Sequence, residues 1–376
     1  MANAAIMGFG TVGSGVREIF DNNNFEKKIG EDINITKILD IRDFEGSVFT
    51  KEFHDILNDK EISVVAETMG GLHPAYEFTK ELLCAGKSVV TSNKELVATY
   101  GAELLELAAK NNVNYLFEAS VGGGIPIIRP MTSCLAANNI EKTAGILNGT
   151  TNYILTEMFE NGKTFDKALS DAQKLGYAER NPAADVEGYD ACRKIAILAS
   201  LAWGKFVDYN DIATEGITEI DEDDVRYAAE FGYVIKLIGY AELKGEKLNI
   251  MVKPMLVDKK SPLGGVDGVY NAILVKGDYL GEAMFYGRGA GKEATASAVA
   301  ADIIDCVKHL GVRKHTIYWN TEDKNFVQNP KEDIAAYMIR SQQQNGAVKV
   351  SKDKKAYITE KISAPEGVKA IRILEV

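Results

Sequence analysis

The chain has 376 residues, of which 46% are hydrophobic and 26% are charged. This composition supplies enough apolar side chains for a sizeable core and excludes a chain that is disordered throughout. At about 150 residues per domain, the length corresponds to roughly two and a half domains. Lys and Arg number 43 against 54 Asp and Glu, so the formal net charge is −11. An acidic chain without a basic run is not expected to bind nucleic acid or an anionic membrane.

The N-terminal residues and the cysteines indicate a cytoplasmic protein. The first eight residues, MANAAIMG, lack the basic segment of a secretory signal. The longest apolar stretch, 195–203, is about half of a membrane span. The cysteines at 84, 134, 192 and 306 are widely spaced and form no CxxC pair or metal-ligand pattern. We therefore expect free thiols in a reducing compartment.

The first 120 residues alternate between short apolar runs, typical of strands, and stretches with helical spacing of apolar residues. The predicted strands are 4–7, 33–41, 62–66, 88–91 and 113–117, and the predicted helices are 12–20, 75–85 and 95–110. Strands that alternate with helices predict an α/β fold with a Rossmann-type, doubly wound parallel sheet covered on both faces.

A glycine-rich turn joins the first predicted strand to the first predicted helix. Its residues are Gly8, Phe9, Gly10, Thr11, Val12 and Gly13. The first glycine permits the tight turn, the second lets the backbone approach a pyrophosphate, and the third lets the helix pack on the strand. The N–H groups of the helix N-terminus then face the phosphates. In this context the motif predicts a dinucleotide site.

The end of the second predicted strand bears on the choice between NAD and NADP. Asp40 is placed to accept a hydrogen bond from the ribose 2′-hydroxyl of NAD, whereas Arg42 is placed to pair with the 2′-phosphate of NADP. The residues 21–32 lengthen the segment between the glycine turn and the second strand. The usual spacing of about 20 residues between the turn and the acidic residue that binds the ribose therefore does not decide between the two cofactors. The sequence is compatible with both NAD and NADP, and Arg42 favours NADP.

Asp190 and Lys194 are four residues apart and therefore neighbours on one helix face. Such pairs are usually exposed ion pairs of little consequence. Here the following residues, 195–203, are apolar on all sides, which indicates a buried helix whose first turn opens into the protein. A lysine there needs a partner, and Glu179 and Asp185 lie just upstream. We interpret this cluster as a functional site.

Two further segments are candidates for ligand contacts. Lys94 follows the carboxyl end of predicted strand 88–91, the edge at which doubly wound sheets bind ligands. Glu118 precedes three consecutive glycines, whose carbonyl oxygens, together with the Glu118 carboxylate, suit a hard cation. From the residues alone, the glycine segment is more often a flexible connector.

Together these segments resemble the homoserine dehydrogenase family, in unbroken order over about residues 1–318. The long motif at 175–199 is highly specific, while the glycine turn is shared with many families. The matching segments are GFGTVGSGV (8–16), TSNKELVA (91–98), EASVGGGIP (118–126), GILNGTTNYIL (145–155), LGYAERNPAADVEGYDACRKIAILA (175–199) and FYGRGAGKEATASAV (285–299).

The resemblance implies a role for each matching residue. Lys194 matches a proton donor to the substrate carbonyl oxygen, and Asp190 matches its partner at the reacting oxygen end. Glu179 and Asp185 match positions that hold the amino-acid end of the substrate, and Lys94 matches a lysine that bridges cofactor and substrate. Lys194 is preferred to Lys94 as the acid because of the buried helix. Further cofactor contacts are implied for Phe9, Thr11, Val12, Gly176, Glu179 and Gly291, and a site for a monovalent cation, Na+, for Glu118, Val121, Gly123 and Ile125.

The implied reaction is the NAD(P)-dependent interconversion of L-aspartate 4-semialdehyde and L-homoserine, in the biosynthetic branch that leads to threonine, methionine and isoleucine. The implied architecture is a dinucleotide domain, 1–130, completed by 286–318, and an α+β catalytic domain, 131–285. Strands of the catalytic domain at 143–147 and 249–256 belong to a sheet suited to dimerisation. We therefore expect a homodimer or a dimer of dimers that acts on a small-molecule substrate.

The tail, 320–376, contains three apolar runs that predict strands, at 334–339, 356–362 and 368–374. The last run resembles the final strand of the small regulatory ACT domain. Between 339 and 356 there is no room for that domain's helices. The tail is therefore either a reduced ACT-like segment or an extra sheet segment at a dimer edge.

Two other functions are weighed against this one. An aspartate-semialdehyde dehydrogenase needs a nucleophilic cysteine beside a base, and no histidine accompanies Cys134 or Cys192. A cofactor-binding sensor without catalysis is expected to lack the pair Asp190 and Lys194, which is intact here.

Overall fold

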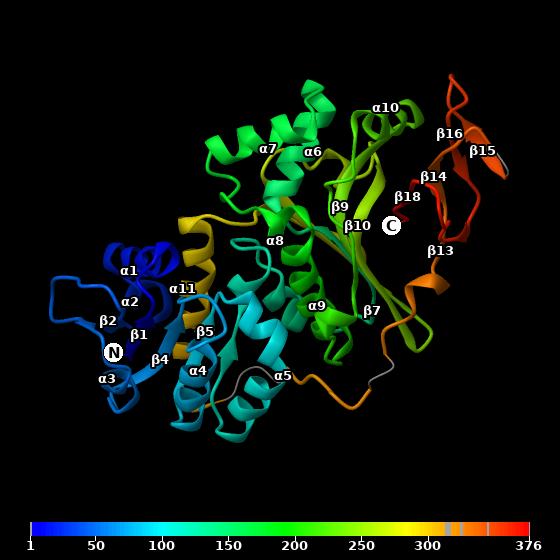
Figure 1. Cartoon of the computed structure of the whole chain (residues 1–376). Coiled ribbons are helices and arrows are strands. Elements are labelled where there is room, and N and C mark those ends of the chain that lie inside the picture. The colour runs from blue at the N-terminus through cyan, green and yellow to red at the C-terminus, as the bar shows by residue number, and fades with distance from the viewer. Residues whose placement is uncertain (1, 313–316, 324–325, 344–345, 376) are drawn as a thin grey trace. The chain divides into compact units, whose positions relative to one another are not determined.

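The computed structural model describes residues 2–312, 317–323, 326–343 and 346–375 (Figure 1). Contacts divide the chain into two compact units. The first unit comprises Met1–Ala137, Ser200–Asp208 and Arg288–Glu322, and the second comprises Asn138–Ala199, Tyr209–Gly287 and Asp323–Val376. Within the ranges described, none of the helices combines the length and the apolar content that crossing a lipid bilayer requires.

The first unit is built on a six-stranded parallel sheet with the order β3-β2-β1-β4-β5-β6. The order reverses between β1 and β4, so their carboxyl ends form the topological switch point at which such sheets bind ligands. All five predicted strands are confirmed, but the second ends before Ile41, which is 91% exposed. The strands are β1 (Ala2–Met7), β2 (Ile33–Leu39), β3 (Phe49–Thr50), β4 (Ile62–Glu67), β5 (Ser88–Thr91) and β6 (Tyr115–Leu116).

Helices cover the sheet of the first unit, and one of them comes from late in the chain. This late helix, α11, packs on α1, where a Cβ at Gly15 would lie 2.9 Å from the Ala296 Cβ. Glycine at position 15 therefore permits the close approach of the two helices. The helices are α1 (Thr11–Asn22), α2 (Glu26–Ile29), α3 (His54–Leu57), α4 (Ala75–Cys84), α5 (Lys94–Lys110) and α11 (Lys292–Lys308), with short helical turns at Glu118–Ser120 and Pro130–Cys134.

The second unit is built on a ten-stranded sheet whose order begins β12-β11-β7-β9-β10. Its centre is the hairpin of β9 and β10, which pair along their whole length from Tyr233 opposite Asp258 to Lys244 opposite Lys247. The predicted strands at 143–147 and 249–256 are confirmed as parts of β7 and β10. These strands are β7 (Ile140–Ile146), β8 (Ala213–Thr214), β9 (Tyr233–Lys244), β10 (Lys247–Asp258), β11 (Tyr270–Gly277) and β12 (Gly281–Arg288).

Among the helices α6 to α10, α9 is the most apolar. Ile195, Ile197 and Leu198 of this helix are at most 1% exposed, which confirms the predicted buried helix. The helices α6 and α10 contact β9 of the sheet. The helices are α6 (Gly149–Asn161), α7 (Phe165–Lys174), α8 (Ala183–Val186), α9 (Tyr189–Trp203) and α10 (Glu222–Phe231), with short helical turns at Tyr209–Asp211, Leu263–Gly265 and Pro330–Glu332.

The tail extends the sheet of the second unit. Its last strand, β18, pairs in parallel with β10, and the order continues β18-β14-β16-β15 through antiparallel pairs. In the described part of 323–375 there is no α-helix. Arg372 of β18 forms a buried ion pair with Asp333, at 2.8 Å. The tail strands are β13 (Ile334–Ala335), β14 (Tyr337–Arg340), β15 (Ala347–Val350), β16 (Ala356–Thr359), β17 (Ile362–Ser363) and β18 (Ala370–Ile373).

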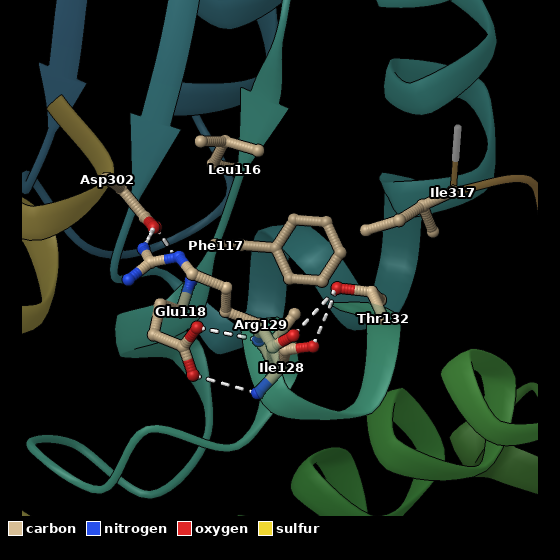
Figure 2. Close-up of a pocket in the computed structure, with 8 residues that line it drawn as sticks. All are labelled: Leu116, Phe117, Glu118, Ile128, Arg129, Thr132, Asp302 and Ile317. Carbon is tan, nitrogen blue, oxygen red and sulfur yellow. Dashed lines mark hydrogen bonds and ion pairs between the residues drawn. The ribbon is translucent and has the colours of Figure 1, made fainter. Parts of the chain in front are cut away.

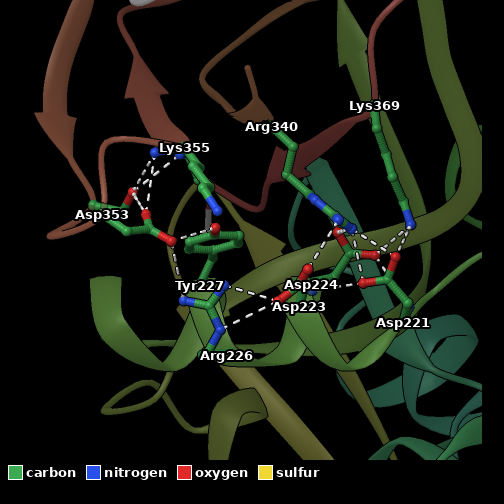
Figure 3. Close-up of polar contacts among 11 residues, drawn as sticks. Asp221, Asp223, Asp224, Arg226, Tyr227, Arg340, Asp353, Lys355 and Lys369 are labelled. Atoms are coloured by element: carbon green, nitrogen blue, oxygen red, sulfur yellow. Dashed lines mark hydrogen bonds and ion pairs between the residues drawn. The ribbon is translucent and has the colours of Figure 1, made fainter. Parts of the chain in front are cut away.

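A cluster of charges ties the tail to the N-terminus of α10 (Figure 3). Asp221 and Asp224 form a capping box on this helix. Arg340 of the tail donates to Asp221 at 2.6 Å and to Asp224 at 3.0 Å, and Lys369 lies 2.6 Å from Asp224. Burial alone would raise the pKa of Asp221, but Arg340, the Asp224 amide and Lys369 together hold it well below its ordinary value. The tail is thus fixed by buried charge as well as by strand pairing.

We predict that Arg340→Met lowers the free energy of unfolding by about 2 kcal/mol at neutral pH, because Asp224 is left buried with fewer partners. Urea denaturation measures the loss, and Lys349→Met on the exposed strand β15 is the control. The pKa of Asp221 is lowered in the folded chain, so its contribution is present at neutral pH and is lost as the pH falls. The difference between Arg340→Met and the unsubstituted protein therefore shrinks in acid, and a difference that grows there would contradict this account.

Candidate active site

The glycine turn after β1 has the geometry that a dinucleotide needs. Gly8 has φ +92°, and a Cβ at Gly13 would lie 2.0 Å from the Gly8 carbonyl oxygen. A Cβ at Gly10, in contrast, would meet no atom within 4 Å. Gly10 is also the N-cap of α1 and has no side chain to cap the first amides of the helix. These amides suit a pyrophosphate.

Asp40 and Arg42 form one unit at the end of β2. The Asp40 carboxylate accepts hydrogen bonds from the Phe9 amide at 2.7 Å and from the Arg42 guanidinium at 2.9 Å. Arg42 holds the pKa of Asp40 well below its ordinary value, against the effect of burial. The Asp40 side chain is only 7% exposed, whereas that of Arg42 is 56% exposed and packs over the ring of Phe44. Asp40 thus anchors the glycine turn, and Arg42 is the group that a ligand can reach.

Lys94 is the first residue of α5, at the carboxyl edge of the sheet of the first unit. The helix begins there because the Asn93 side chain accepts a hydrogen bond from the Leu96 amide at 3.1 Å. Gly291, in the same unit, is the N-cap of α11 and has φ +120°. The open space around Gly291, where a Cβ would meet no atom within 4 Å, allows backbone to approach a ligand.

The Glu118 carboxylate is engaged by backbone amides (Figure 2). Its oxygens accept hydrogen bonds from the amides of Ile127, Ile128 and Arg129 at 2.6–2.8 Å. Asp302 of α11 in turn accepts hydrogen bonds from the Glu118 amide and from Arg129. Burial and the charge of Glu118 raise the pKa of Asp302 to about 7. The Glu118 carboxylate oxygens thus hold the chain after the glycine segment. The expected cation site at Glu118 stays a prediction.

The glycine segment itself is tightly packed. Gly123 has φ +56°, and a Cβ there would lie 2.3 Å from the Gly289 carbonyl oxygen. Val121 and Ile125 are buried on either side. No group of three or more His, Cys, Asp or Glu side chains in the described ranges is placed to hold a metal ion. The donors that this segment offers to a cation are backbone carbonyl oxygens, a set that suits a hard cation.

In the second unit, Lys194 and Asp190 form the predicted pair in the first turns of α9. Their side chains are 10% and 6% exposed, and the Lys194 Nζ lies 2.7 Å from the Asp190 Oδ2. Lys194 also donates to the carbonyl oxygen of Leu147, at the end of β7, at 2.8 Å. These contacts give the ammonium an opposite charge and a hydrogen-bond acceptor, as a nearly buried lysine requires.

Asn148 connects this pair to Asp185 and was not predicted. Its Nδ2 donates to the Asp185 Oδ1 at 2.7 Å and to the Asp190 Oδ2 at 2.9 Å. Its Oδ1 accepts from the Thr151 amide and so caps α6. Burial and the charge of Asp190 raise the pKa of Asp185, and Asn148 opposes that shift. An asparagine between a strand and a helix signals a cap, but nothing in the sequence signals its two carboxylate partners.

Gly176 and Glu179 lie on an exposed segment after α7. Gly176 has φ +75°, which allows the turn that follows the helix. The Glu179 carboxylate has neither a hydrogen-bond nor an ion-pair partner in the ranges that the structure covers. It is therefore not part of the network of Asp185, Asp190 and Lys194.

A parallel sheet with an open glycine turn at its switch point, and a buried lysine–carboxylate pair, define an oxidoreductase that uses a nicotinamide dinucleotide. Comparisons with known families and structures give the particular family. Residues 8–118 match the model of the homoserine dehydrogenase NAD-binding domain, and residues 126–304 match that of homoserine dehydrogenase. The chain belongs to the homoserine dehydrogenase family. It is an NAD(P)-dependent enzyme that interconverts L-homoserine and L-aspartate 4-semialdehyde.

Individual relatives agree over most of the chain. Homoserine dehydrogenase from Synechocystis is 45% identical over 314 residues, which cover 80% of this chain and 72% of the relative. The crystal structure of a homoserine dehydrogenase from Thiobacillus denitrificans has a TM-score of 0.91 and 33% identity, and the match covers 100% of this chain and 98% of that one. A hyperthermophilic archaeal homoserine dehydrogenase mutant in complex with NADPH has a TM-score of 0.70 and 32% identity, over 81% of this chain and 97% of that one.

We predict that Asn148→Ser separates the two roles of this residue. Serine still caps α6, so the melting temperature stays close to that of the unsubstituted protein. The amide bridge to Asp185 and Asp190 is lost, so kcat/KM for homoserine oxidation, followed at 340 nm, falls about tenfold or more. Asn148→Ala loses both the cap and the bridge and is expected to lower both quantities. Native kcat/KM in Asn148→Ser would show that the bridge has no role in the reaction.

Proposed function

We propose that Lys194 is the proton donor to the carbonyl oxygen of L-aspartate 4-semialdehyde. The observation that carries this proposal is the buried contact of Lys194 with Asp190 and the Leu147 carbonyl. The dinucleotide, when bound, supplies the hydride to the carbonyl carbon. A positive charge fixed in a water-poor site stabilises the developing alkoxide, and Lys194 passes its proton to that oxygen. Asp190 orients the Lys194 Nζ and contacts the reacting oxygen end of the substrate.

The remaining carboxylates suit the ammonium group of the substrate. We propose that Asp185 and Glu179 hold this group and that Lys94 bridges cofactor and substrate. Asp185 is fixed by Asn148, and burial and the charge of Asp190 raise its pKa. A nearby ammonium would relieve the repulsion between Asp185 and Asp190. The exposed Glu179 is available for the same group.

We predict that Lys194→Ala lowers kcat by at least about a hundredfold, while the Kd of the dinucleotide, measured by fluorescence, stays within about threefold. The control is Lys167→Ala. Lys167 forms an ion pair with Asp171, four residues later, at 3.0 Å on the exposed surface of α7. This control is expected to keep native kcat because exposed pairs contribute little. If Lys94→Ala abolishes turnover and Lys194→Ala does not, the two roles are reversed.

We also propose that NADP is preferred to NAD, through Arg42. The Asp40 oxygens are already engaged by Phe9 and Arg42, which disfavours their use by a ribose 2′-hydroxyl. The exposed Arg42 guanidinium matches a 2′-phosphate in charge and shape. The archaeal relative in complex with NADPH supports the same choice.

We predict that Arg42→Leu lowers kcat/KM for NADPH about tenfold or more and changes kcat/KM for NADH much less, because only NADPH carries the 2′-phosphate. Arg17→Leu, which removes an arginine from the exposed pair with Asp21 on α1, is the control and is expected to leave the NADPH/NADH ratio unchanged. Initial rates with each cofactor at varied concentration measure the ratio. An unsubstituted protein that already prefers NADH would contradict the proposal.

We further propose a Na+ site formed by Glu118, Val121, Gly123 and Ile125. The close packing of the glycine segment, in which Val121 and Ile125 are buried and backbone carbonyl oxygens are the available ligands, supports this site. Since the Glu118 carboxylate holds three amides, Glu118 would contribute its backbone oxygen.

A homodimer or a dimer of dimers is also proposed, with the sheet of the second unit at the interface. β12 is an edge strand, and its Met284 and Tyr286 side chains are 38% and 53% exposed. An exposed apolar edge is a common site of pairing with a second chain. We propose a cytoplasmic location as well, which suits the four free cysteines.

The proposed domains follow the function. Residues 1–130 with 286–318 bind the dinucleotide, residues 131–285 bind the substrate, and the tail, 320–376, is an added segment of the substrate-binding sheet. The parallel pairing of β18 with β10 supports this view of the tail.

A further inference from the structure

Glu67 is a fully buried carboxylate that the proposed mechanism does not use. It is the last residue of β4, and its register partner is Thr91, the last residue of β5. Both residues lie at the carboxyl edge of the parallel sheet, next to the switch point between β1 and β4. This is the edge at which the dinucleotide binds in such sheets.

The Glu67 carboxylate closes a ring of hydrogen bonds between two turns. Its Oε1 accepts from the Met69 amide at 2.8 Å, and its Oε2 accepts from the Thr91 hydroxyl at 2.5 Å. The Thr91 Oγ1 accepts from the Asn93 amide at 2.9 Å, and the Asn93 Nδ2 donates to the Gly71 carbonyl at 2.6 Å. The turn after β4 is thereby joined to the junction of β5 and α5, where Lys94 begins the helix.

The same ring reaches the glycine turn after β1. A Cβ at Gly8 would lie 2.8 Å from the Met69 Cα, so the backbone at Met69 is the wall against which Gly8 packs. The Thr68 hydroxyl donates to the Gly8 carbonyl at 2.8 Å. Because Glu67 fixes the Met69 amide, a single carboxylate sets the ends of β1, β4 and β5.

Burial of the Glu67 carboxylate costs free energy, and an apolar side chain at this position would pack without that cost. Burial raises the pKa of Glu67, and the hydrogen bonds from Thr91 and Met69 oppose that shift. The hydroxyl of nearby Tyr115 is also buried, without a hydrogen-bond partner in the ranges described, and the charge of Glu67 raises its pKa further. Well-packed apolar side chains in place of buried charged groups often stabilise a protein. A buried carboxylate at the ligand edge therefore points to a role in the site.

We propose that Glu67 is a positioning residue that holds the Gly8 turn and the Asn93–Lys94 helix start in one geometry for the dinucleotide. For Lys94 the inference rests on the proposed function of that residue, whereas for Gly8 it rests on the glycine turn alone. The role is geometric, and it needs a hydrogen-bonding group of the shape of Glu67.

Substitutions at Glu67 and Thr91 test this role. Glu67→Gln keeps the shape: its carbonyl oxygen can accept from the Met69 amide, and its NH2 can donate to the Thr91 Oγ1, which then accepts where it donates to Glu67 in the native protein. We expect its kcat/KM within about threefold of native and that of Glu67→Leu reduced about thirtyfold or more, with a weaker dinucleotide Kd, since ångström displacements are costly in catalysis. Thr91→Val removes two hydrogen bonds of the ring, the one to Glu67 and the one from the Asn93 amide, and is expected to lower kcat/KM about fivefold. The matched control is Thr79→Val, because the buried Thr79 hydroxyl in α4 has no hydrogen-bond partner in the described ranges.

Each outcome bears on the proposal. Equal losses in Glu67→Gln and Glu67→Leu would overturn it, since charge rather than geometry would then matter. Native kinetics in Thr91→Val would overturn it too, and this variant keeps the test valid if Glu67→Leu fails to fold. In a Lys94→Ala background, Glu67→Leu is expected to weaken dinucleotide binding while adding little further loss in kcat. If Lys94→Ala alone is without effect, the proposed function of Lys94 fails, and the dinucleotide Kd of Glu67→Leu still tests the Gly8 turn.

Discussion

A lysine ammonium that is nearly removed from water has to be neutralised and hydrogen-bonded, and the second unit is organised around this requirement. Asp190 meets it from the same helix, one turn earlier, and the Leu147 carbonyl meets it from the end of β7. The next residue in the chain, Asn148, binds Asp190 and Asp185 while it caps α6. A strand end, a helix start and a buried helix are thus fixed relative to one another by one charge.

The first unit also depends on buried charged groups that are hydrogen-bonded, but in this unit the groups are carboxylates. The turns at the carboxyl edge of its sheet are held by buried carboxylates that accept hydrogen bonds from backbone amides. Glu67 holds the turn after β4, and Glu118 holds three successive amides at 127–129. Asp302 ties Glu118 to α11, so the last helix of the unit is bound to the same edge. Buried acids of this kind give a rigid loop structure where a ligand needs fixed backbone groups.

The sequence reveals interactions that are local, and it conceals those that join distant segments. The alternation of strands and helices and the glycine turn depend on neighbouring residues, and so does the pair of Asp190 and Lys194, four apart on one helix. Asn148 and Asp190 are 42 residues apart, and Glu118 and Asp302 are 184 apart. No periodicity encodes such partners, so the sequence alone does not show which amides the Glu118 carboxylate binds. The two-residue strand β3 was missed because it is too short to show a pattern.

The late position of α11 has a consequence for how the protein forms during synthesis. Residues 1–137 leave the ribosome well before Lys292–Lys308, yet Val16 and Phe20 of α1 share one apolar core with Val299 and Ile303 of α11. Until that helix has been translated, the apolar surface of α1 and of the neighbouring strands lacks its cover. Domains generally fold as units, and an uncovered apolar face invites aggregation. The dinucleotide fold therefore reaches its final form only after most of the second unit has been made, which couples the maturation of one unit to the synthesis of the other.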